Sequence, residues 1–367
     1  MKIQYDYQIF TNQQYGGISR YFYELIKRFD GVTNSCDVAL LLSNNAYYNQ
    51  DVNPKLKPFF PNSNSRLTNK FFRTVNQQNS SYVERKADFD VFHPTYYDDC
   101  FIDKIKGKPF IVTFHDMIHE KFSNQFKELK SDIKIFDGKK RLLEHSSKVI
   151  AISETTKIDI VEIFDINPSK IDVVYHGNSL QNFDIGNKRL VDDDYILFVG
   201  NRGIYKNFDF FVTSIAELVI DHKLKLICAG GGDFTLQELT LLKSLKLEQH
   251  VVLKKIINDD VLANYYTHAL FFCFPSLYEG FGIPVLESFA CGCPALLSKG
   301  GALPEVGGDA ALYFDPTDAE SLKRPAYELI SNEASRLSIK EKGFERLSKF
   351  SWDKTYLETL EIYKSVV

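Results

Sequence analysis

The sequence lacks several features that mark common protein classes. It has no run of about 18 apolar residues, the length that a membrane-spanning helix requires. It also has no excess of positive charge, since 44 Lys and Arg stand against 48 Asp and Glu and the formal net charge is -4. This charge balance argues against a nucleic-acid-binding protein, because binding to phosphates favours a basic surface.

Cysteine is scarce too, with six residues, no C-x-x-C pair and no regular spacing. Cys291 and Cys293 lie too close in sequence for an ordinary structural disulfide, so we expect mostly buried free thiols in a reducing compartment. The chain starts directly with strand-like sequence, and no charged and apolar leader precedes it. These features predict a cytoplasmic protein.

What the sequence does contain is an alternation of short apolar runs and helical patterns. In the first half, strands are predicted at 3–9, 38–42, 91–93, 110–114 and 148–152, and helices at 18–28 and 154–164. In the second half, strands are predicted at 195–199, 225–229, 251–254, 270–274 and 295–297, and helices at 207–220, 236–243, 260–267 and 284–290. This alternation predicts α/β architecture with parallel sheets covered by helices.

The chain is long enough for two domains. Its 367 residues, 44% of them hydrophobic, suffice for two cores of ordinary size. The polar stretch 177–194 has few periodic apolar positions and is the predicted boundary. Because ligands bind beyond the carboxyl ends of strands in open α/β sheets, candidate site residues are sought just after each strand.

The segment after the predicted strand 270–274 is the strongest candidate. It reads Ser-Leu-Tyr-Glu-Gly-Phe-Gly-Ile-Pro-Val-Leu-Glu, from Ser276 to Glu287. Its two glycines allow the backbone to approach a ligand closely, and Pro284 suits the first turn of a helix. A helix N-terminus delivered in this way favours an anion such as phosphate. Glu279 and Glu287 are carboxylates that can accept hydrogen bonds from sugar or ribose hydroxyls.

A basic loop follows the strand 195–199. Arg202 and Lys206 lie four positions apart beside a predicted helix start. Arginine can bind two phosphate oxygens at once and lysine adds a point charge, so the pair could contact a diphosphate. A solvated basic turn is the alternative.

Together these motifs resemble the retaining glycosyltransferases of GT-B architecture in family 4, also called glycosyl transferases group 1. The segment Glu279–Glu287 is similar to the family's E-x7-E signature, and Tyr15-Gly16-Gly17 resembles its glycine-rich first loop. The resemblance implies two Rossmann-like domains with parallel sheets facing across a cleft. They would span residues 1–180 and 190–350, with a final helix 352–367 crossing back to the first domain.

The resemblance also implies roles for individual residues. His115, Asp116 and Glu279 would be catalytic, with His115 at the carboxyl end of the strand 110–114. The implied donor-binding residues are Arg202, Lys206, Gly280, Phe281, Gly282, Ile283, Glu287 and Gly17. Arg202 departs slightly from the family pattern, because Asn201 stands between it and the glycine that ends the strand. His176, which also follows a predicted strand, is a weaker candidate.

The implied reaction moves a sugar from a nucleotide-sugar donor to a hydroxyl of a glycan or lipid-linked acceptor, with retention of configuration. The nearest subgroup resembles the bacterial mannosyltransferases of O-antigen or capsule synthesis, which implies GDP-mannose as donor. No metal or other cofactor is implied. Two alternatives remain open: a sugar-nucleotide 2-epimerase of the same fold, and a non-catalytic protein that binds sugar nucleotides.

Three other patterns need an interpretation. His115 and His119 have the spacing of a zinc-binding helical pair, but Asp116 stands where a zinc protease has glutamate. The acidic run 192–194 contains D-x-D, yet it precedes a strand, at the wrong end for a ligand. The stretch Lys55–Arg73 has five basic residues, four phenylalanines and no acidic residue. It could contact an anionic membrane surface or could be an ordinary loop and helix with aromatic residues in the core.

Overall fold

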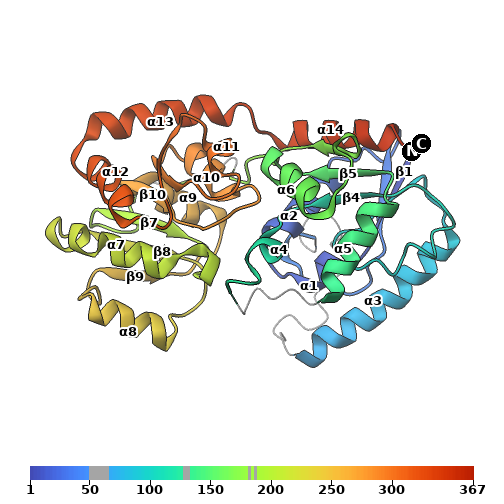
Figure 1. Cartoon of the computed structure of the whole chain (residues 1–367), viewed down its shortest axis with the longest axis horizontal. Coiled ribbons are helices and arrows are strands. Elements are labelled where there is room, and N and C mark those ends of the chain that lie inside the picture. The colour runs from blue at the N-terminus through green and yellow to red at the C-terminus, as the bar shows by residue number, and fades with distance from the viewer. Residues whose placement is uncertain (49–65, 127–132, 181–182, 186–187) are drawn as a thin grey trace. The chain divides into compact units, whose positions relative to one another are not determined.

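A computed structural model describes residues 1–48, 66–126, 133–180, 183–185 and 188–367 (Figure 1). The chain forms two compact units. Unit 1 comprises Met1–His176 together with Trp352–Val367, and unit 2 comprises Gly177–Ser351.

Unit 1 contains two three-stranded parallel sheets, in the orders β2-β1-β3 and β4-β5-β6, which a single bridge between Phe92 and Phe110 connects. Its strands are β1 (Lys2–Tyr5), β2 (Ser35–Val38), β3 (Val91–His93), β4 (Ile111–Phe114), β5 (Lys148–Ala151) and β6 (Ile171–Val173). Its helices are α1 (Gln8–Asn12), α2 (Gly17–Ile26), α3 (Arg66–Lys86), α4 (Ile118–Phe122), α5 (Ile133–His145), α6 (Glu154–Phe164), the 3-10 turn η3 (Pro168–Lys170) and α14 (Trp352–Lys364).

Unit 2 is built on one six-stranded parallel sheet of order β12-β11-β10-β7-β8-β9. Its strands are β7 (Tyr195–Val199), β8 (Lys225–Ala229), β9 (Val251–Lys254), β10 (Phe271–Phe274), β11 (Ala295–Ser298) and β12 (Ala311–Phe314). Its helices are η4 (Ile204–Lys206), α7 (Phe208–Asp221), α8 (Leu236–Ser244), α9 (Asp259–His268), α10 (Ile283–Ala290), α11 (Leu303–Gly307), α12 (Ala319–Ser331) and α13 (Glu333–Leu347).

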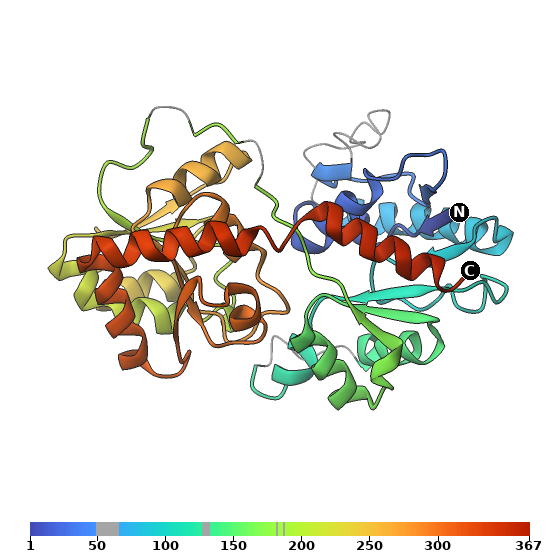
Figure 2. The same cartoon turned by 90° about the horizontal axis from the view of Figure 1, so that it is seen from above.

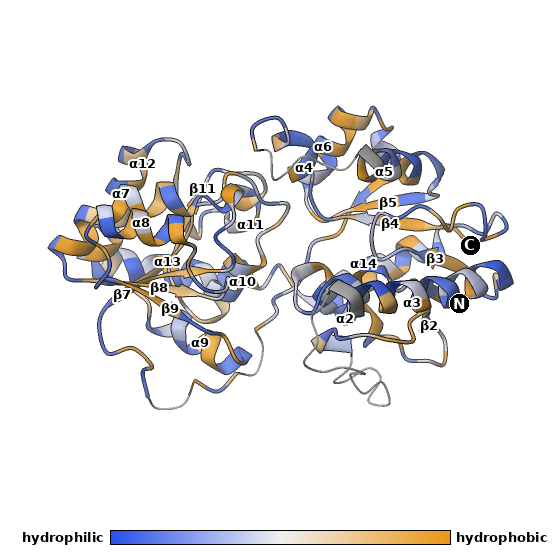
Figure 3. Ribbon diagram, turned by 90° about the horizontal axis from the view of Figure 1, so that it is seen from below, coloured by the Kyte–Doolittle hydropathy of each residue, from blue (hydrophilic) through white to orange (hydrophobic). Residues whose placement is uncertain are grey.

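Hydrophobic strands form the core of each unit. In unit 2 all five residues of β7 and all four of β10 are buried, as expected for a sheet that is covered on both faces. Figure 3 shows hydrophobic colour on strands of both units, while the helices carry a mixture of polar and apolar residues. The apolar sides of α7 and α12 pack into the same cluster as β7 and β8. The predicted α/β class with parallel sheets is therefore confirmed.

Two predicted strands differ from the structure by several residues, in both cases because side chains bind the backbone there. The strand predicted at 3–9 ends at Tyr5, since the Asp6 carboxylate accepts from the backbone N–H of Gln8 at 3.1 Å and α1 then begins. The strand predicted at 38–42 lies at Ser35–Val38 instead. The N–H groups of Leu41 and Leu42 donate to the Asn76 side chain at 2.9 and 3.0 Å rather than to a neighbouring strand.

The C-terminal helix α14 is attached to unit 1 by buried polar contacts. The Tyr363 hydroxyl lies 2.6 Å from Nδ1 of His93 and 2.9 Å from the Tyr5 hydroxyl. Trp352 at the start of the helix is buried, with its ring 5.4 Å from that of His176. Figure 2 shows α14 in red beside the other elements of this unit. Residues from the two ends of the chain therefore share one core.

Two of the buried histidines of unit 1, His93 and His176, make its stability pH-dependent. Burial lowers the pKa of His93 and of His176 to about 3, from an ordinary value of 6.5. Below pH 6.5 the unfolded chain takes up protons that the folded unit does not, so each histidine destabilises the fold as the pH falls towards 3. The buried Asp6, whose pKa burial raises to about 7, has the opposite effect. A comparison with a variant is therefore needed to isolate one histidine.

We predict that His93→Gln reduces the loss of stability on acidification. Between pH 7.5 and 5 the free energy of unfolding should fall by about 2 kcal/mol less in the variant than in the native chain. Urea unfolding followed by the fluorescence of Trp352, the single tryptophan, reports on unit 1 alone. Identical pH profiles for the two proteins would contradict the assignment of a neutral, buried His93.

Candidate functional site

The order of the strands in unit 2 creates a switch point between β7 and β10. From β7 the chain first adds β8 and β9 on one side, then β10 to β12 on the other. The loops that leave the carboxyl ends of β7 and β10 therefore run in opposite directions, which is the usual position of a ligand in such sheets. The backbone N–H of Leu277 donates to the carbonyl of Tyr205 at 2.7 Å, so the two loops are in direct contact.

These loops bring Lys206 and Glu279 together as an ion pair. Nζ of Lys206 lies 2.6 Å from Oε1 of Glu279, and the two side chains are only 13% and 11% exposed. The ammonium also lies 4.9 Å from the centre of the Phe274 ring. Burial lowers the pKa of Lys206. The Glu279 carboxylate and the neighbouring Tyr205 raise this pKa by more than burial lowers it, so the net pKa is above its ordinary value. Lys206 therefore stays charged at neutral pH.

The loop of Glu279 is supported by two glycines that follow β11. A Cβ on Gly301, which has a φ of +61°, would lie 2.2 Å from the carbonyl oxygen of Glu279 and 2.6 Å from its nitrogen. A Cβ on Gly300 would lie 2.5 Å from the carbonyl oxygens of Ser276 and Leu277. The N–H of Ala302 donates to the Glu279 carbonyl at 2.8 Å. The sequence analysis missed these glycines, although the adjacent pair after a strand was a visible signal.

The same loop ends at the N-terminus of α10. Gly282 occupies the N-cap position with a φ of +99°, and Pro284 lies in the first turn. No side chain caps this end, and the first turn has no acidic residue to offset the positive end of the helix dipole. Gly280 and Phe281 are buried in the loop, and Ile283 is the first, half-buried residue of the helix.

Glu287 lies one turn into α10 and is half-buried. Oε2 of Glu287 accepts a hydrogen bond from the Tyr266 hydroxyl of α9 at 3.2 Å. That hydroxyl also contacts the carbonyl of Pro284 at 3.3 Å. Tyr266 is a residue that the sequence analysis missed, because nothing in the sequence connects it with Glu287.

Arg202 has a different environment from Lys206. Its side chain is 3% exposed, and Nε lies 2.7 Å from Oε1 of Glu238 in α8. Its two terminal nitrogens donate to the carbonyls of Gly230, Gly232 and Asp233 at 3.3, 3.1 and 2.9 Å. In this structure the guanidinium therefore holds the glycine loop after β8, where Gly230, Gly231 and Gly232 all have positive φ. Neither this loop nor Glu238 was predicted from the sequence.

In unit 1, His115 follows β4 and is buried within a group of rings. It stacks on His176 with the ring centres 6.0 Å apart and an angle of 13°, and its centre lies 5.2 Å from the ring of Tyr21. Nε2 of His115 is buried without a hydrogen-bond partner among the described residues. Burial, with smaller contributions from His176, His93 and Lys139, holds the pKa of His115 well below its ordinary value. Its imidazole is therefore neutral.

The other predicted residues of unit 1 are more exposed. Asp116 is half-buried, and its carboxylate accepts from the N–H of Ile118 at 3.2 Å, which starts α4. His119 lies within α4. Gly17 is exposed as the first residue of α2, where the Gln13 side chain accepts from the N–H of Ser19 at 3.2 Å. Within the described ranges, no group of three or more His, Cys, Asp or Glu residues is arranged to hold a metal ion.

The basic-aromatic stretch lies only in part among the described residues. Lys55, Lys57, Phe59 and Phe60 fall outside them, and the side chain of Arg66 is not described either. In α3, Lys70, Phe71 and Arg73 are exposed, whereas Phe72 is buried. Among the described residues, no helix has the length and apolarity needed to cross a membrane. Contact of this stretch with a membrane surface stays a prediction. All six cysteines are described and are free thiols.

Solved structures establish the class of the fold. Sucrose-phosphate synthase from Thermosynechococcus elongatus superposes with a TM-score of 0.80 at 18% identity, covering 100% of this chain and 98% of that one. The Anabaena protein HepE, solved in complex with UDP and glucose, superposes with a TM-score of 0.75 at 15% identity over the full length of both chains. The fold is that of the GT-B glycosyltransferases.

Family models match almost the whole sequence. Residues 15–181 match the model described as Glycosyltransferase Family 4, and residues 181–346 match Glycosyl transferases group 1. The chain belongs to this family of glycosyltransferases.

Curated relatives agree with the family at modest identity. An uncharacterized glycosyltransferase of Methanocaldococcus jannaschii is 29% identical over 234 residues, 60% of each chain. O-antigen chain mannosyltransferase B of Escherichia coli is 35% identical over 108 residues, 29% of this chain and 28% of that protein. The MMP alpha-(1->4)-mannosyltransferase of Mycolicibacterium hassiacum is 24% identical over 298 residues, 77% of this chain and 72% of that protein. The first two matches thus span less than two thirds of those relatives' own lengths.

We predict that Gly301→Ala lowers the free energy of unfolding of unit 2 by more than a positive φ alone would cost an alanine. Alanine at a positive φ costs roughly 1–2 kcal/mol by itself, and here its Cβ would also overlap the backbone of Glu279. Gly232→Ala is the matched control, because Gly232 has a φ of +73° and no atom within 4 Å of its added Cβ. Equal losses in the free energy of unfolding, measured in urea, would contradict this role for Gly301.

Proposed function

We propose that the chain transfers a sugar from a nucleotide-sugar donor to a hydroxyl of a glycan or lipid-linked acceptor, with retention of configuration. The observation that carries the proposal is the Lys206–Glu279 ion pair at the switch point of unit 2. Glu279 lies in the loop that leads to the N-terminus of α10, which no side chain caps. A cation and a helix N-terminus at the carboxyl edge of a parallel sheet suit a diphosphate. Family membership supports the same class of reaction.

In the proposed reaction, negative charge develops on the leaving diphosphate. The Lys206 ammonium, charged because its pKa is raised, would stabilise that charge together with the amides at the start of α10. No metal is then required in the proposal. The phosphate would replace Glu279 as the partner of Lys206, and Glu279 could then accept hydrogen bonds from the donor sugar. Glu287 would accept hydrogen bonds from the ribose hydroxyls.

The acceptor would bind to unit 1 in this proposal. The strand order β2-β1-β3 also has a switch point, between β1 and β3. A cavity of about 750 Å³ lies beyond these strands and includes Gln8, Asn12, Tyr96, Tyr97 and Asp98 in its lining. The Tyr97 hydroxyl accepts from the backbone N–H of His115 at 3.1 Å, so this cavity lies next to the predicted catalytic histidine.

Mannose from GDP-mannose is the proposed donor sugar. The support is the names of the relatives, which include the O-antigen chain mannosyltransferases of Escherichia coli and Salmonella typhimurium. HepE, by contrast, was solved with UDP and glucose. The donor must therefore be tested directly.

We predict that one nucleotide family, GDP in this proposal, raises the melting temperature of the chain. A thermal-shift screen of GDP, UDP, ADP and their sugar conjugates measures this directly. Glu287→Ala should abolish the shift, whereas Lys243→Ala on the exposed side of α8 should keep it. A selective shift with UDP would replace the mannose proposal, and no shift with any nucleotide would overturn the function.

The ion pair allows a sharper test of Lys206. Removing the lysine alone leaves Glu279 buried without its cation, so Lys206→Met should destabilise unit 2 by several kcal/mol. The double variant Lys206→Met/Glu279→Gln removes both charges and should recover most of this stability. We predict that it still fails to bind the nucleotide, because the phosphate contact is lost. Calorimetric titration with the nucleotide from the screen, next to urea unfolding, checks both parts, and nucleotide binding by the double variant would contradict the proposed role.

A further inference from the structure

Arg202 lies in the basic loop of the proposed donor site, but its guanidinium is already engaged by the protein. Its Nε donates to Glu238, Nη1 donates to the carbonyl of Gly230, and Nη2 donates to the carbonyls of Gly232 and Asp233. A guanidinium carries five N–H groups. These four bonds leave it a single further N–H to offer a ligand.

The surroundings of Arg202 also work against a phosphate contact. Its side chain is 3% exposed, and its Cζ atom lies 4.5 Å from the centre of the Phe234 ring. A diphosphate would have to compete with the Glu238 carboxylate, which is itself fixed because Oε2 accepts from the N–H of Thr235 at 2.7 Å. The three backbone carbonyls would lose their donor in the same step.

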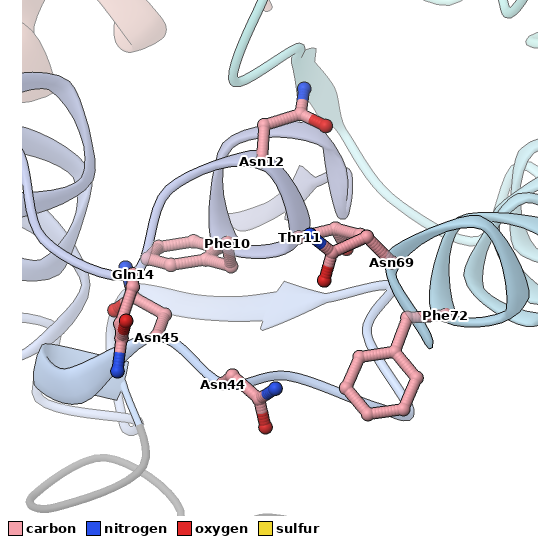
Figure 4. A pocket seen from close by; sticks show the side chains of 8 residues that line it. All are labelled: Phe10, Thr11, Asn12, Gln14, Asn44, Asn45, Asn69 and Phe72. Atoms are coloured by element: carbon pink, nitrogen blue, oxygen red, sulfur yellow. The ribbon is translucent and has the colours of Figure 1, made fainter. Parts of the chain in front are cut away.

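Side chains beside a cavity can be spent on the protein's own backbone, as unit 1 also shows. Figure 4 shows Asn45 in the lining of a cavity of about 290 Å³. Asn45 donates to the carbonyl of Gln13 at 2.8 Å and accepts from the N–H of Tyr48 at 3.0 Å. Its amide therefore fixes the chain around the cavity, and the contacts of Arg202 are of the same kind.

The glycine loop that Arg202 holds packs directly on the start of the basic loop. Gly231 has a φ of +81°, and a Cβ on it would lie 2.6 Å from the carbonyl oxygen of Gly200 and 3.0 Å from Cα of Asn201. The two backbones therefore touch without a side chain between them. By binding the carbonyls of the glycine loop, Arg202 fastens this loop to its own.

Lys206 follows in the same loop, four residues after Arg202. The loop begins with Gly200, whose φ of +113° is open to glycine and strained for other residues. Its second half is fixed by the hydrogen bond from the N–H of Leu277 to the carbonyl of Tyr205 at 2.7 Å. Arg202 is the side chain that ties the first half to the loop after β8.

We propose that Arg202 is a positioning residue for the donor nucleotide. It holds the loop so that the Lys206 ammonium meets Glu279 and then the diphosphate, and it does not contact the phosphates itself. Fixing Lys206 before the nucleotide arrives reduces the entropy lost on binding. Glu238 acts with Arg202 by keeping the guanidinium on the glycine loop. The inference rests on the proposed function, but the effect on Lys206 can be tested without a nucleotide.

The first test separates positioning from a phosphate contact by the effect of Glu238. Arg202→Lys keeps the charge but lacks the planar fork that binds several carbonyls, and Glu238→Gln keeps Arg202 but removes its carboxylate. Calorimetric titration with GDP and UDP should show at least ten-fold weaker binding of the preferred nucleotide to both variants. A guanidinium that contacts phosphate would be freed by Glu238→Gln, so unchanged or tighter binding by this variant would overturn the inference.

The second test follows Lys206 in the protein without nucleotide. Its side chain is 13% exposed and paired with Glu279, so it should react slowly with an amine-acetylating reagent, which mass spectrometry of the peptide measures. We expect acetylation of Lys206 to be at least five-fold faster in Arg202→Lys and in Glu238→Gln. Equal rates in the native chain and both variants would overturn the inference.

Val219→Ala is the control for a general loss of stability. Val219 is buried in the core near the C-terminal end of α7, at the opposite end of the sheet from the loops after β7 and β8. Its truncation should lower the free energy of unfolding and leave both nucleotide binding and acetylation of Lys206 unchanged. Acceleration of acetylation by this control as large as in the two loop variants would also overturn the inference.

The two tests distinguish failure of this inference from failure of the proposed function. If no nucleotide binds the native chain, the proposed function fails, and the acetylation rates then decide by themselves whether Arg202 holds Lys206. If a nucleotide binds and the acetylation rates do not differ, only the positioning role fails. Urea unfolding verifies that each variant folds, and Glu238→Asp, with a shorter side chain and the same expected effects, replaces Glu238→Gln if that variant does not.

Discussion

The central position of β7 in a fully parallel sheet is the constraint on which the site of unit 2 depends. Since β8 pairs on one side of β7 and β10 on the other, the chain must leave these strands in two directions. The loops after β7 and β10 meet at the resulting gap, where the Leu277–Tyr205 hydrogen bond joins them. Lys206 and Glu279 are far apart in sequence and become partners only because of this pairing of strands.

Burying an ion pair costs free energy of folding, because both charges lose their hydration. In unit 2 Gly300 and Gly301 pack closely on the backbone of residues 276–279, and the Glu279 carboxylate has Lys206 as its partner. A diphosphate that takes over Lys206 would replace one anion by another and leave the ammonium paired. The cost of burying the lysine is then already met in the free protein, which is how preorganised electrostatic sites work.

Arg202 and Lys206 are both basic residues of the same loop, but their surroundings give them different contacts. The position of Arg202 after β7 predicted a phosphate contact, and that contact stays a prediction. The structure shows that its guanidinium binds Glu238 and three backbone carbonyls of the glycine loop after β8. Arg202 therefore holds the glycine loop after β8 through these three carbonyls.

The sequence by itself determined the class of fold and the position of the main loops. The strands at 91–93, 195–199, 225–229 and 251–254 were predicted with the bounds that the structure has, because short apolar runs leave a strong local signal. The helix α12 was missed, and Pro325 within it interrupts that kind of signal. The segment Ser276–Glu287 could be recognised because its glycines, proline and glutamates are close together in the chain.

Only the tertiary structure decided which side chains meet. The partners Lys206 and Glu279 are 73 positions apart, and His93 and Tyr363 are 270 apart. Such contacts depend on how elements distant in sequence pack against each other, and neither periodicity nor local spacing records that packing. The sequence therefore predicts many of the elements and the loop Ser276–Glu287, whereas the partners of each charge and the shape of each cavity come from the packed fold.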